Sequence, residues 1–384
     1  MALVRGERAA RSSGRSSALI LALVAALLGG FLAPGSASAE RFSGESTVHT
    51  NTATEGDGTR TPDIVSTGAD RAVVAWREGT VPGKVDQGYI RYGYTTDGGA
   101  SWSRPKVLAQ ETSQYAWHYV VLYQAGGEVF AYLGRTSATS SNGLPIDAVV
   151  VKRSTDEGHT WQDYHVSMPT DIRNLIMAGR PLRLADGTHV IPFWSSGRRN
   201  GLLRSTNLKN WTAGGFVPDP SGYQGAEPQI AVEQDDSRTL VMKARSSRTP
   251  SSQAYAATAT STDSGRTWTP FALDPNVPNH DTKGYFTKDS GGRYLAIYNT
   301  AKDRQILHYK VKRPGGSWGP GRLFADGPPV TDGTGAGWDT YAMADEYAPG
   351  RFYVAWEHDT SSIKVRRLDI SGTGRSPLSP APPA

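Results

Sequence analysis

Residues 154–161 read STDEGHTW, and the same pattern recurs as TTDGGASW at 95–102 and as STDSGRTW at 261–268. All three fit S/T-x-D-x-G-x-S/T-W. With average residue usage, a chance match has a probability on the order of one in a million per starting position. Weaker copies, STNLKNW at 205–211 and GGSW at 315–318, fill the gaps. The five copies end in tryptophans that stand 50 to 59 residues apart, which indicates a repeated structural unit.

Each motif has the composition of a tight turn that side chains hold closed. The aspartate accepts hydrogen bonds from backbone N–H groups of its own turn. The glycine adopts a backbone conformation that a Cβ would resist, and the tryptophan buries a large ring against the adjoining strands. We therefore interpret these aspartates as structural and not catalytic.

The stretches between the motifs are short and rich in residues that favour strands. Examples are AVVAW at 72–76 and FYVAW at 352–356, and no long segment shows helical periodicity. A unit of four strands in about fifty residues, repeated six times, predicts an all-β, six-bladed β-propeller over residues 57–370. We expect its sixth unit to be closed by residues 60–76 together with C-terminal strands near 352–356 and 363–368.

The N-terminus has the features of a secretory signal peptide over residues 1–39. Four arginines precede an apolar run at 18–28, and an Ala-Ser-Ala cleavage site follows. The apolar run is too short to span a bilayer comfortably. We therefore expect a secreted, extracellular protein without stable membrane association after cleavage. We expect a flexible N-terminal segment at 40–56 and a disordered tail, rich in Pro and Ser, at 371–384.

Composition narrows the possible partners. Cleavage would remove four arginines and one glutamate, which lowers the formal net charge from +5 to +2. Because Lys and Arg are scattered among Asp and Glu, we do not expect a nucleic acid partner. The chain has no cysteine, so its fold depends on its core. The eight histidines lack the spacing of a metal site, and we expect no cofactor. The many carboxylates are compatible with a bound calcium ion. We expect a monomer.

The repeated motif resembles the Asp-box, or BNR repeat, of the sialidase (neuraminidase) superfamily, and the resemblance covers residues 60–368. Other proteins on propellers also carry Asp-boxes, so function has to be examined residue by residue. Sialidases have an arginine just before a proline in the first blade, and Arg60-Thr61-Pro62 is similar. They have a catalytic aspartate on a loop before the first box, where Asp86 lies.

The remaining family positions also have counterparts. The Glu-Pro motif of sialidases matches Glu227-Pro228, and the arginine of the next strand matches Arg245. A third family arginine, which opens a strand after the fourth box, matches Arg304. The tyrosine before the final blade matches Tyr341. The stretch VPNHD at 277–281 is similar to a P-N-P loop of bacterial sialidase-like proteins, from which its histidine departs.

The resemblance implies a retaining exo-α-sialidase-like glycoside hydrolase that cleaves terminal acidic sugars from glycans. Arg60, Arg245 and Arg304 would bind the sugar carboxylate through charge-assisted hydrogen bonds. Tyr341 would be the nucleophile, since a neutral phenol is not repelled by that carboxylate. Glu227 would be its base, and Asp86 would protonate the leaving oxygen and later activate water.

Two other functions fit the same scaffold. A polysaccharide lyase acting on uronate glycans would use His and Tyr near an Arg, and His118 and His280 do not follow from the sialidase pattern. A carbohydrate-binding propeller without catalysis would need none of these roles. Within the site, Arg248 competes with Arg245, and two later tyrosines at 347 and 353 compete with Tyr341.

Overall fold

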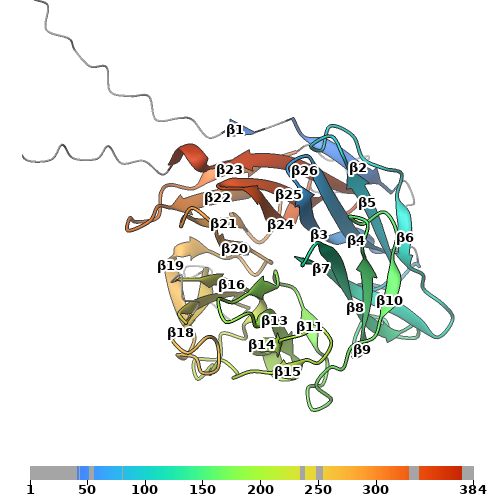
Figure 1. Cartoon of the computed structure of the whole chain (residues 1–384), viewed down its shortest axis with the longest axis horizontal. Coiled ribbons are helices and arrows are strands. Elements are labelled where there is room, and N and C mark those ends of the chain that lie inside the picture. The colour runs from blue at the N-terminus through green and yellow to red at the C-terminus, as the bar shows by residue number, and fades with distance from the viewer. Residues whose placement is uncertain are drawn as a thin grey trace, which may run out of the picture. The chain divides into compact units, whose positions relative to one another are not determined.

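The described residues form a six-bladed β-propeller, as the sequence predicted. A computed structural model describes residues 41–42, 44–51, 56–79, 81–233, 238–247, 254–327 and 337–373. These residues build six antiparallel sheets that follow one another around a common axis (Figure 1). The predicted signal peptide and the tail beyond residue 373 lie outside the described residues. In the described part of the chain, no helix has the length and apolarity needed to cross a membrane.

Five blades consist of strands that follow one another in the chain. Blade 1 contains β3 (Gly58–Gly68), β4 (Arg71–Gly79), β5 (Tyr89–Thr95) and β6 (Lys106–Ala109). Blade 2 contains β7 (Tyr115–Ala125), β8 (Glu128–Ser137), β9 (Ile146–Ser154) and β10 (Gln162–Tyr164). Blade 3 contains β11 (Ile176–Met177), β12 (Leu182–Arg183), β13 (His189–Ser195), β14 (Arg199–Ser205) and β15 (Thr212–Ala213). Blade 4 contains β16 (Ala226–Val232), β17 (Leu240–Arg245), β18 (Tyr255–Ser261) and β19 (Ala272–Pro278). Blade 5 contains β20 (Tyr285–Lys288), β21 (Tyr294–Asn299), β22 (Leu307–Lys312) and β23 (Arg322–Ala325).

The sixth blade joins the two ends of the propeller. Its strands are β24 (Asp339–Ala348), β25 (Arg351–His358) and β26 (Ser362–Asp369), followed at the outer edge by β1 (Arg41–Phe42) and β2 (Ser46–Thr50). Both N-terminal strands pair antiparallel with β26. Two expectations are corrected here. The segment 40–56, expected to be flexible, contains two paired strands. Residues 60–76, expected to close the ring, lie in blade 1, and β2 closes it because the outer edge of β26 would otherwise be unpaired.

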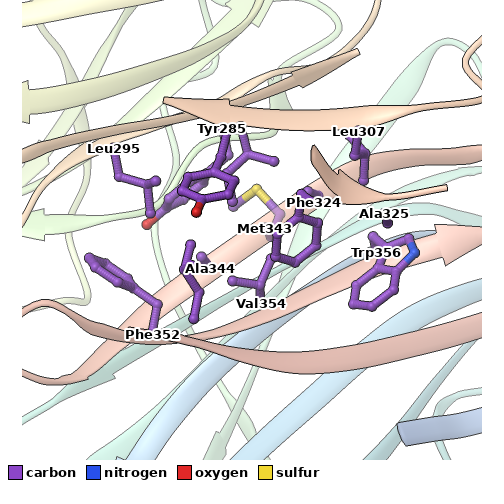
Figure 2. Close-up of a cluster of buried hydrophobic side chains, with 14 of the residues drawn as sticks. Tyr285, Leu295, Leu307, Phe324, Ala325, Met343, Ala344, Phe352, Val354 and Trp356 are labelled. Atoms are coloured by element: carbon purple, nitrogen blue, oxygen red, sulfur yellow. The ribbon is translucent and has the colours of Figure 1, made fainter. Parts of the chain in front are cut away.

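The hydrophobic core is divided among the contacts between neighbouring blades. Each of the six buried clusters combines residues of two adjacent blades, and one of them joins blades 5 and 6 (Figure 2). In that cluster, Tyr285 and Leu295 of blade 5 pack with Met343 and Trp356 of blade 6. Trp356 is fully buried. A ring of such contacts explains how a chain without cysteine holds its blades together.

The repeated motifs form the turns between the last two strands of their blades. In the first of them, the hydroxyl groups of Thr95 and Ser101 donate to the carboxylate of Asp97 over 2.8 and 2.5 Å. The N–H of Ser101 donates to the same carboxylate over 2.9 Å. The hydrogen bond from the Ser101 side chain, followed by that from its N–H, lowers the pKa of Asp97 to about 2. The contacts are those of a turn clasp, which agrees with the structural interpretation of these aspartates.

The innermost strands of neighbouring blades contact one another, except that blade 3 meets β16 of blade 4 through β13. Buried ion pairs connect the blades in this central region. Arg180, between β11 and β12, donates from Nη2 to Asp63 of β3 over 2.8 Å, and its Nη1 lies 3.5 Å from Asp345 of β24. The other carboxylate oxygen of Asp63 accepts from the N–H of Leu122 in β7. This layer, defined by Asp63, Arg180 and Asp345, links blades 1, 2, 3 and 6.

Candidate active site

The innermost strands of blades 1, 4 and 6 are irregular at equivalent positions, which Thr61, Glu227 and Tyr341 occupy; the predicted site residue Arg60 directly precedes Thr61. The pairing of β3 shifts between Arg60 and Asp63, that of β16 around Glu227, and that of β24 around Tyr341. Thr61, Glu227 and Tyr341 have φ angles of 49°, 50° and 54°. A bulge re-aims the side chains that stand on it. The same device therefore turns residues of three blades out of their sheets.

These side chains line a cavity of about 290 Å³. Five predicted site residues are among those that line it: Arg60, Asp86, Glu227, Arg245 and Tyr341. The sixth, Arg304, does not line it, but its guanidinium carbon lies 5.3 Å from the centroid of the Tyr341 ring. Two larger hollows, of about 490 and 500 Å³, are lined by none of the six residues. The smaller cavity is the candidate site because the titratable groups converge there.

Arg245 connects the proposed nucleophile with its proposed base. Its Nη1 donates to the Tyr341 hydroxyl and to Glu227 Oε2, in each case over 3.2 Å. Its Nε donates to Asp281 Oδ1 over 2.8 Å. Burial, and then the charge of Glu227, raise the pKa of Tyr341, while Arg245 and Arg304 act in the opposite direction. The phenol is therefore neutral at pH 7 and adjacent to a carboxylate that can accept its proton.

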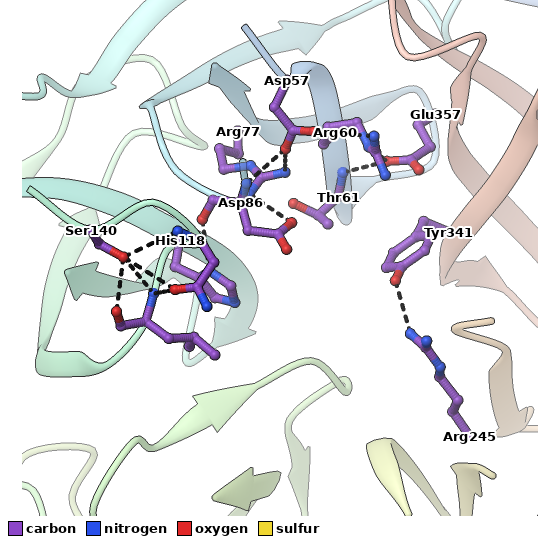
Figure 3. Close-up of polar contacts among 12 residues, drawn as sticks. Asp57, Arg60, Thr61, Arg77, Asp86, His118, Ser140, Arg245, Tyr341 and Glu357 are labelled. Atoms are coloured by element: carbon purple, nitrogen blue, oxygen red, sulfur yellow. Dashed lines mark hydrogen bonds and ion pairs between the residues drawn. The ribbon is translucent and has the colours of Figure 1, made fainter. Parts of the chain in front are cut away.

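On the other side of the cavity, hydrogen bonds with Arg77 and Asp57 hold Asp86 in place (Figure 3). Arg77, which is fully buried in β4, donates to Asp86 Oδ1 over 3.1 Å and to Asp57 Oδ2 over 2.6 Å. The N–H of Asp86 also donates to Asp57 Oδ2, over 2.9 Å. Burial raises the pKa of Asp86, but Arg77 and then His118 outweigh this effect, so its pKa lies below the usual value.

His118 fixes the backbone of the same residue. Its Nδ1 lies 2.7 Å from the carbonyl oxygen of Asp86. Because a carbonyl accepts hydrogen bonds, Nδ1 carries the hydrogen and Nε2 keeps a lone pair. Burial, and then Arg77, lower the pKa of His118, which keeps its ring neutral at pH 7. His118 lines the cavity, whereas the other unexplained histidine, His280, does not.

Arg60 is held by two acidic residues. Its Nε donates to Glu357 Oε2 over 3.2 Å, and its Nη1 donates to Asp57 Oδ1 over 3.4 Å. Glu357 is completely buried in β25 and also accepts from the N–H of Thr61 over 2.8 Å. The carboxylates fix the guanidinium group of Arg60 at the cavity, where it can still bind an anion.

Comparison with known proteins places the chain in a family. The BNR repeat-like domain matches residues 70–360. The chain belongs to the BNR repeat-like family. No curated protein matches its sequence.

Solved structures with the same architecture include several sialidases. The Hadza microbial sialidase Hz136 is 16% identical, with a TM-score of 0.66 over 85% of this chain and 68% of that chain. The intramolecular trans-sialidase from Ruminococcus gnavus is 15% identical, with a TM-score of 0.63 over 86% of this chain and 99% of that chain. A protein of unknown function from Dyadobacter fermentans is 15% identical, with a TM-score of 0.64 over 85% of this chain and 99% of that chain. At such identities, the likeness establishes a sialidase-like propeller fold.

The structure of this BNR repeat-like protein also separates the competing tyrosines. The hydroxyl of Tyr353 donates to the carbonyl of Ala69 over 2.9 Å, and that of Tyr347 accepts from Arg367 over 3.0 Å. Neither tyrosine lines the cavity. Arg248, the competitor of Arg245, lies outside the described residues.

Sequence reasoning missed the residues that hold the predicted ones in place. Arg77 and Glu357 each follow a tryptophan in an apolar strand, and both are completely buried. A charged residue in such a run is a signal of a paired interior charge. Asp57 stands in a polar stretch that offered no comparable signal, whereas Asp281 belongs to the stretch 277–281 that the sequence analysis singled out. Among the described residues, no group of three or more His, Asp or Glu side chains could hold a metal ion.

Proposed function

We propose that the protein is an exo-acting, retaining sialidase-like glycoside hydrolase that removes terminal acidic sugars from glycans. The observation that carries the proposal is the contact of one arginine with both a neutral tyrosine and a glutamate, in a cavity that Asp86 also lines. Arg60, Arg245 and Arg304 are the proposed carboxylate ligands. A tyrosine nucleophile suits such a substrate because it carries no charge before the reaction.

The proposed reaction has two steps. In the first, the Tyr341 oxygen attacks the anomeric carbon and its proton passes to Glu227, while Asp86 gives a proton to the departing glycan oxygen. The bond from the anomeric carbon to that oxygen breaks. In the second step, Asp86 takes a proton from water, and the water oxygen attacks the anomeric carbon. The bond from that carbon to the Tyr341 oxygen breaks, and Glu227 returns a proton to the tyrosine oxygen. The configuration of the sugar is thereby retained.

The test is release of a fluorophore from an α-sialoside, with a uronate oligosaccharide assayed beside it. We expect fluorophore release and no new near-ultraviolet absorbance from the uronate substrate. The neutral imidazole of His118 at the cavity favours a second candidate, a polysaccharide lyase. A lyase would produce an unsaturated uronate that absorbs in the near ultraviolet and would leave the sialoside intact.

We also propose that the protein is secreted after removal of residues 1–39. The support is the arginine-rich start, the apolar run and the Ala-Ser-Ala site. Expression of the full chain in a secreting bacterial host should yield extracellular protein that begins at Glu40. Intracellular protein that retains Met1 would contradict this proposal.

A further inference from the structure

Lys283 occupies in blade 5 the place that candidate catalytic residues occupy in their own blades. It stands two residues before the first paired residue of β20. Glu227 stands two residues before Gln229, and Tyr341 two before Met343, where pairing resumes after the bulges. Among the described residues that line the cavity, Lys283 is the contribution of blade 5. The symmetry of the propeller therefore directs this side chain to the site.

The side chain of Lys283 is buried without a partner. The residue is only 6% exposed, and its ammonium group makes no hydrogen bond or ion pair with the described residues. The nearby carboxylates already have partners, since Asp63 is paired with Arg180 and Glu357 with Arg60. The Nζ atom of Lys283 is accessible to solvent. Because the side chain lines the cavity, this atom is exposed to the cavity.

This arrangement costs stability in the free protein. An ammonium group on a mostly buried side chain, without hydrogen bonds to the protein, loses part of its hydration and gains little in return. Burial accordingly lowers the pKa of Lys283, although Asp63 and then Glu227 act in the opposite direction. An anionic oxygen placed in the cavity would supply the missing partner. Nζ lies 6.0 Å from the centroid of the Tyr341 ring, so that such an oxygen would lie beside the proposed nucleophile.

We propose that Lys283 is a ligand-binding cation of the cavity that donates from its ammonium group to the carboxylate of the bound acidic sugar. For the class of ligand, the inference rests on the proposed function. It does not depend on turnover, because binding alone requires the contact. It adds to the three arginines an ammonium donor that precedes β20 at the start of blade 5.

The test is calorimetric titration with free sialic acid, glucuronic acid and their methyl esters. We expect Lys283→Met to weaken binding of at least one acid by roughly 10- to 100-fold, the range of a charge-assisted hydrogen bond. Lys283→Arg should restore part of that loss. Esterification should weaken binding to the wild type more than binding to Lys283→Met, because the variant has already lost one of the contacts to the carboxylate.

Lys243 offers a matched control. It is 7% exposed, but its Nζ is paired with Asp274 at 2.5 Å, and it does not line the cavity. Lys243→Met should lower the melting temperature and leave ligand binding unchanged. Lys283→Met should keep or raise the melting temperature, because it removes an unpaired buried charge.

The outcomes separate this inference from the proposed function. Unchanged affinity of Lys283→Met for both acids overturns the inference even if the wild type hydrolyses sialosides. A wild type that binds neither acid overturns it as well. Weakened binding in a protein without turnover supports the inference while the proposed hydrolysis fails. A fall in melting temperature as large as that of Lys243→Met, with intact binding, would assign Lys283 to structure instead.

Discussion

Several of the proposed site residues hold a backbone conformation that side chains normally avoid. Asp86, Arg304 and Tyr341 have φ angles of 57°, 61° and 54°, and none of them is a glycine. Such positions cost on the order of 1–3 kcal/mol each and persist only where the surroundings determine them. Here the surroundings are blades with buried, ion-paired side chains. Part of the backbone strain of this protein is therefore located at residues to which we assign chemistry.

Replacement of Tyr341 by phenylalanine tests the nucleophile. We expect Tyr341→Phe to lower kcat by at least about 10³-fold, because no oxygen remains to attack the anomeric carbon. Binding of free sialic acid should change little, since the arginines remain. The measurement pairs steady-state rates with calorimetric titration. Tyr353→Phe is the control, because its hydroxyl contacts Ala69 away from the cavity, and it should keep full activity.

The pH dependence of the rate tests Asp86. As a general acid it must be protonated, and its pKa in the free protein lies below the usual value because Arg77 outweighs the effect of burial. Consequently, kcat/KM for a natural glycoside should fall as pH rises above that pKa. Arg77→Gln removes the positive charge and should raise the pKa of Asp86. The fall in kcat/KM should therefore occur at higher pH in this variant.

The control for this experiment is an arginine in the next strand. Arg91 pairs with Glu78 at 3.1 Å and does not line the cavity. Arg91→Gln should leave the pH profile in place. A limb that does not move in Arg77→Gln would contradict the assignment of Asp86 as the acid, provided that thermal unfolding shows the variant to be folded.

At the scale of elements, the loop between β8 and β9 covers the residue that we propose as the acid. Its Ser141 carbonyl accepts from the N–H of Val85 over 3.1 Å. Gly143 of this loop has a φ of +68°, and a Cβ there would lie 2.0 Å from the Asp86 carbonyl oxygen and 2.5 Å from His118 Nδ1. The loop therefore fits the contact between these two residues only with glycine.

A pair of glycine substitutions separates this contact from backbone strain. Gly143→Ala and Gly222→Ala both place an alanine at positive φ, and a Cβ at Gly222 would meet nothing within 4 Å. Gly222→Ala should destabilise the fold by about 1 kcal/mol, and Gly143→Ala by more, because its Cβ would clash with the Asp86 carbonyl oxygen. Only Gly143→Ala should also reduce kcat/KM, because it displaces Asp86 and His118. Equal effects of the two variants on turnover would contradict a role of this loop in the site.

The strands and turns also show which features the sequence patterns could reveal and which they could not. Turn motifs and apolar strands are local signals, and they predicted the six blades. The pairing of β2 with β26 depends on residues about 300 positions apart, such as Ser46 with Val365, and no local pattern reports it. Arg60 and Tyr341 were identified by short motifs. Lys283 could not be identified in this way, because its significance lies in its equivalence to residues of other blades.

The propeller as a whole depends on the strand that closes it. Val48 of β2 is 7% exposed and packs in the cluster that joins blades 6 and 1. A chain lacking residues 1–51 should therefore lose at least about 2 kcal/mol of unfolding free energy from that side chain alone. It should also lose turnover, since Arg60 and Tyr341 lie on the two blades that β2 helps to join. Urea unfolding measures the first effect.

A shorter truncation provides the control. Removing residues 1–43 deletes β1 but retains β2. This variant should unfold close to the midpoint of the chain that begins at residue 40. Equal stability of the two truncated proteins would show that β2 contributes nothing to ring closure.

The strand β2 also sets the order of events during folding. It is among the first described parts of the chain to be synthesised, and its partner β26 is among the last. Contacts between such distant segments form slowly because a long loop has to close first. Until then, the outer edge of blade 6 offers unpaired backbone groups to other chains. Aggregation during refolding should therefore depend on the pairing of β2 with β26. In a chain that ends before β26, the ring of blades would stay open.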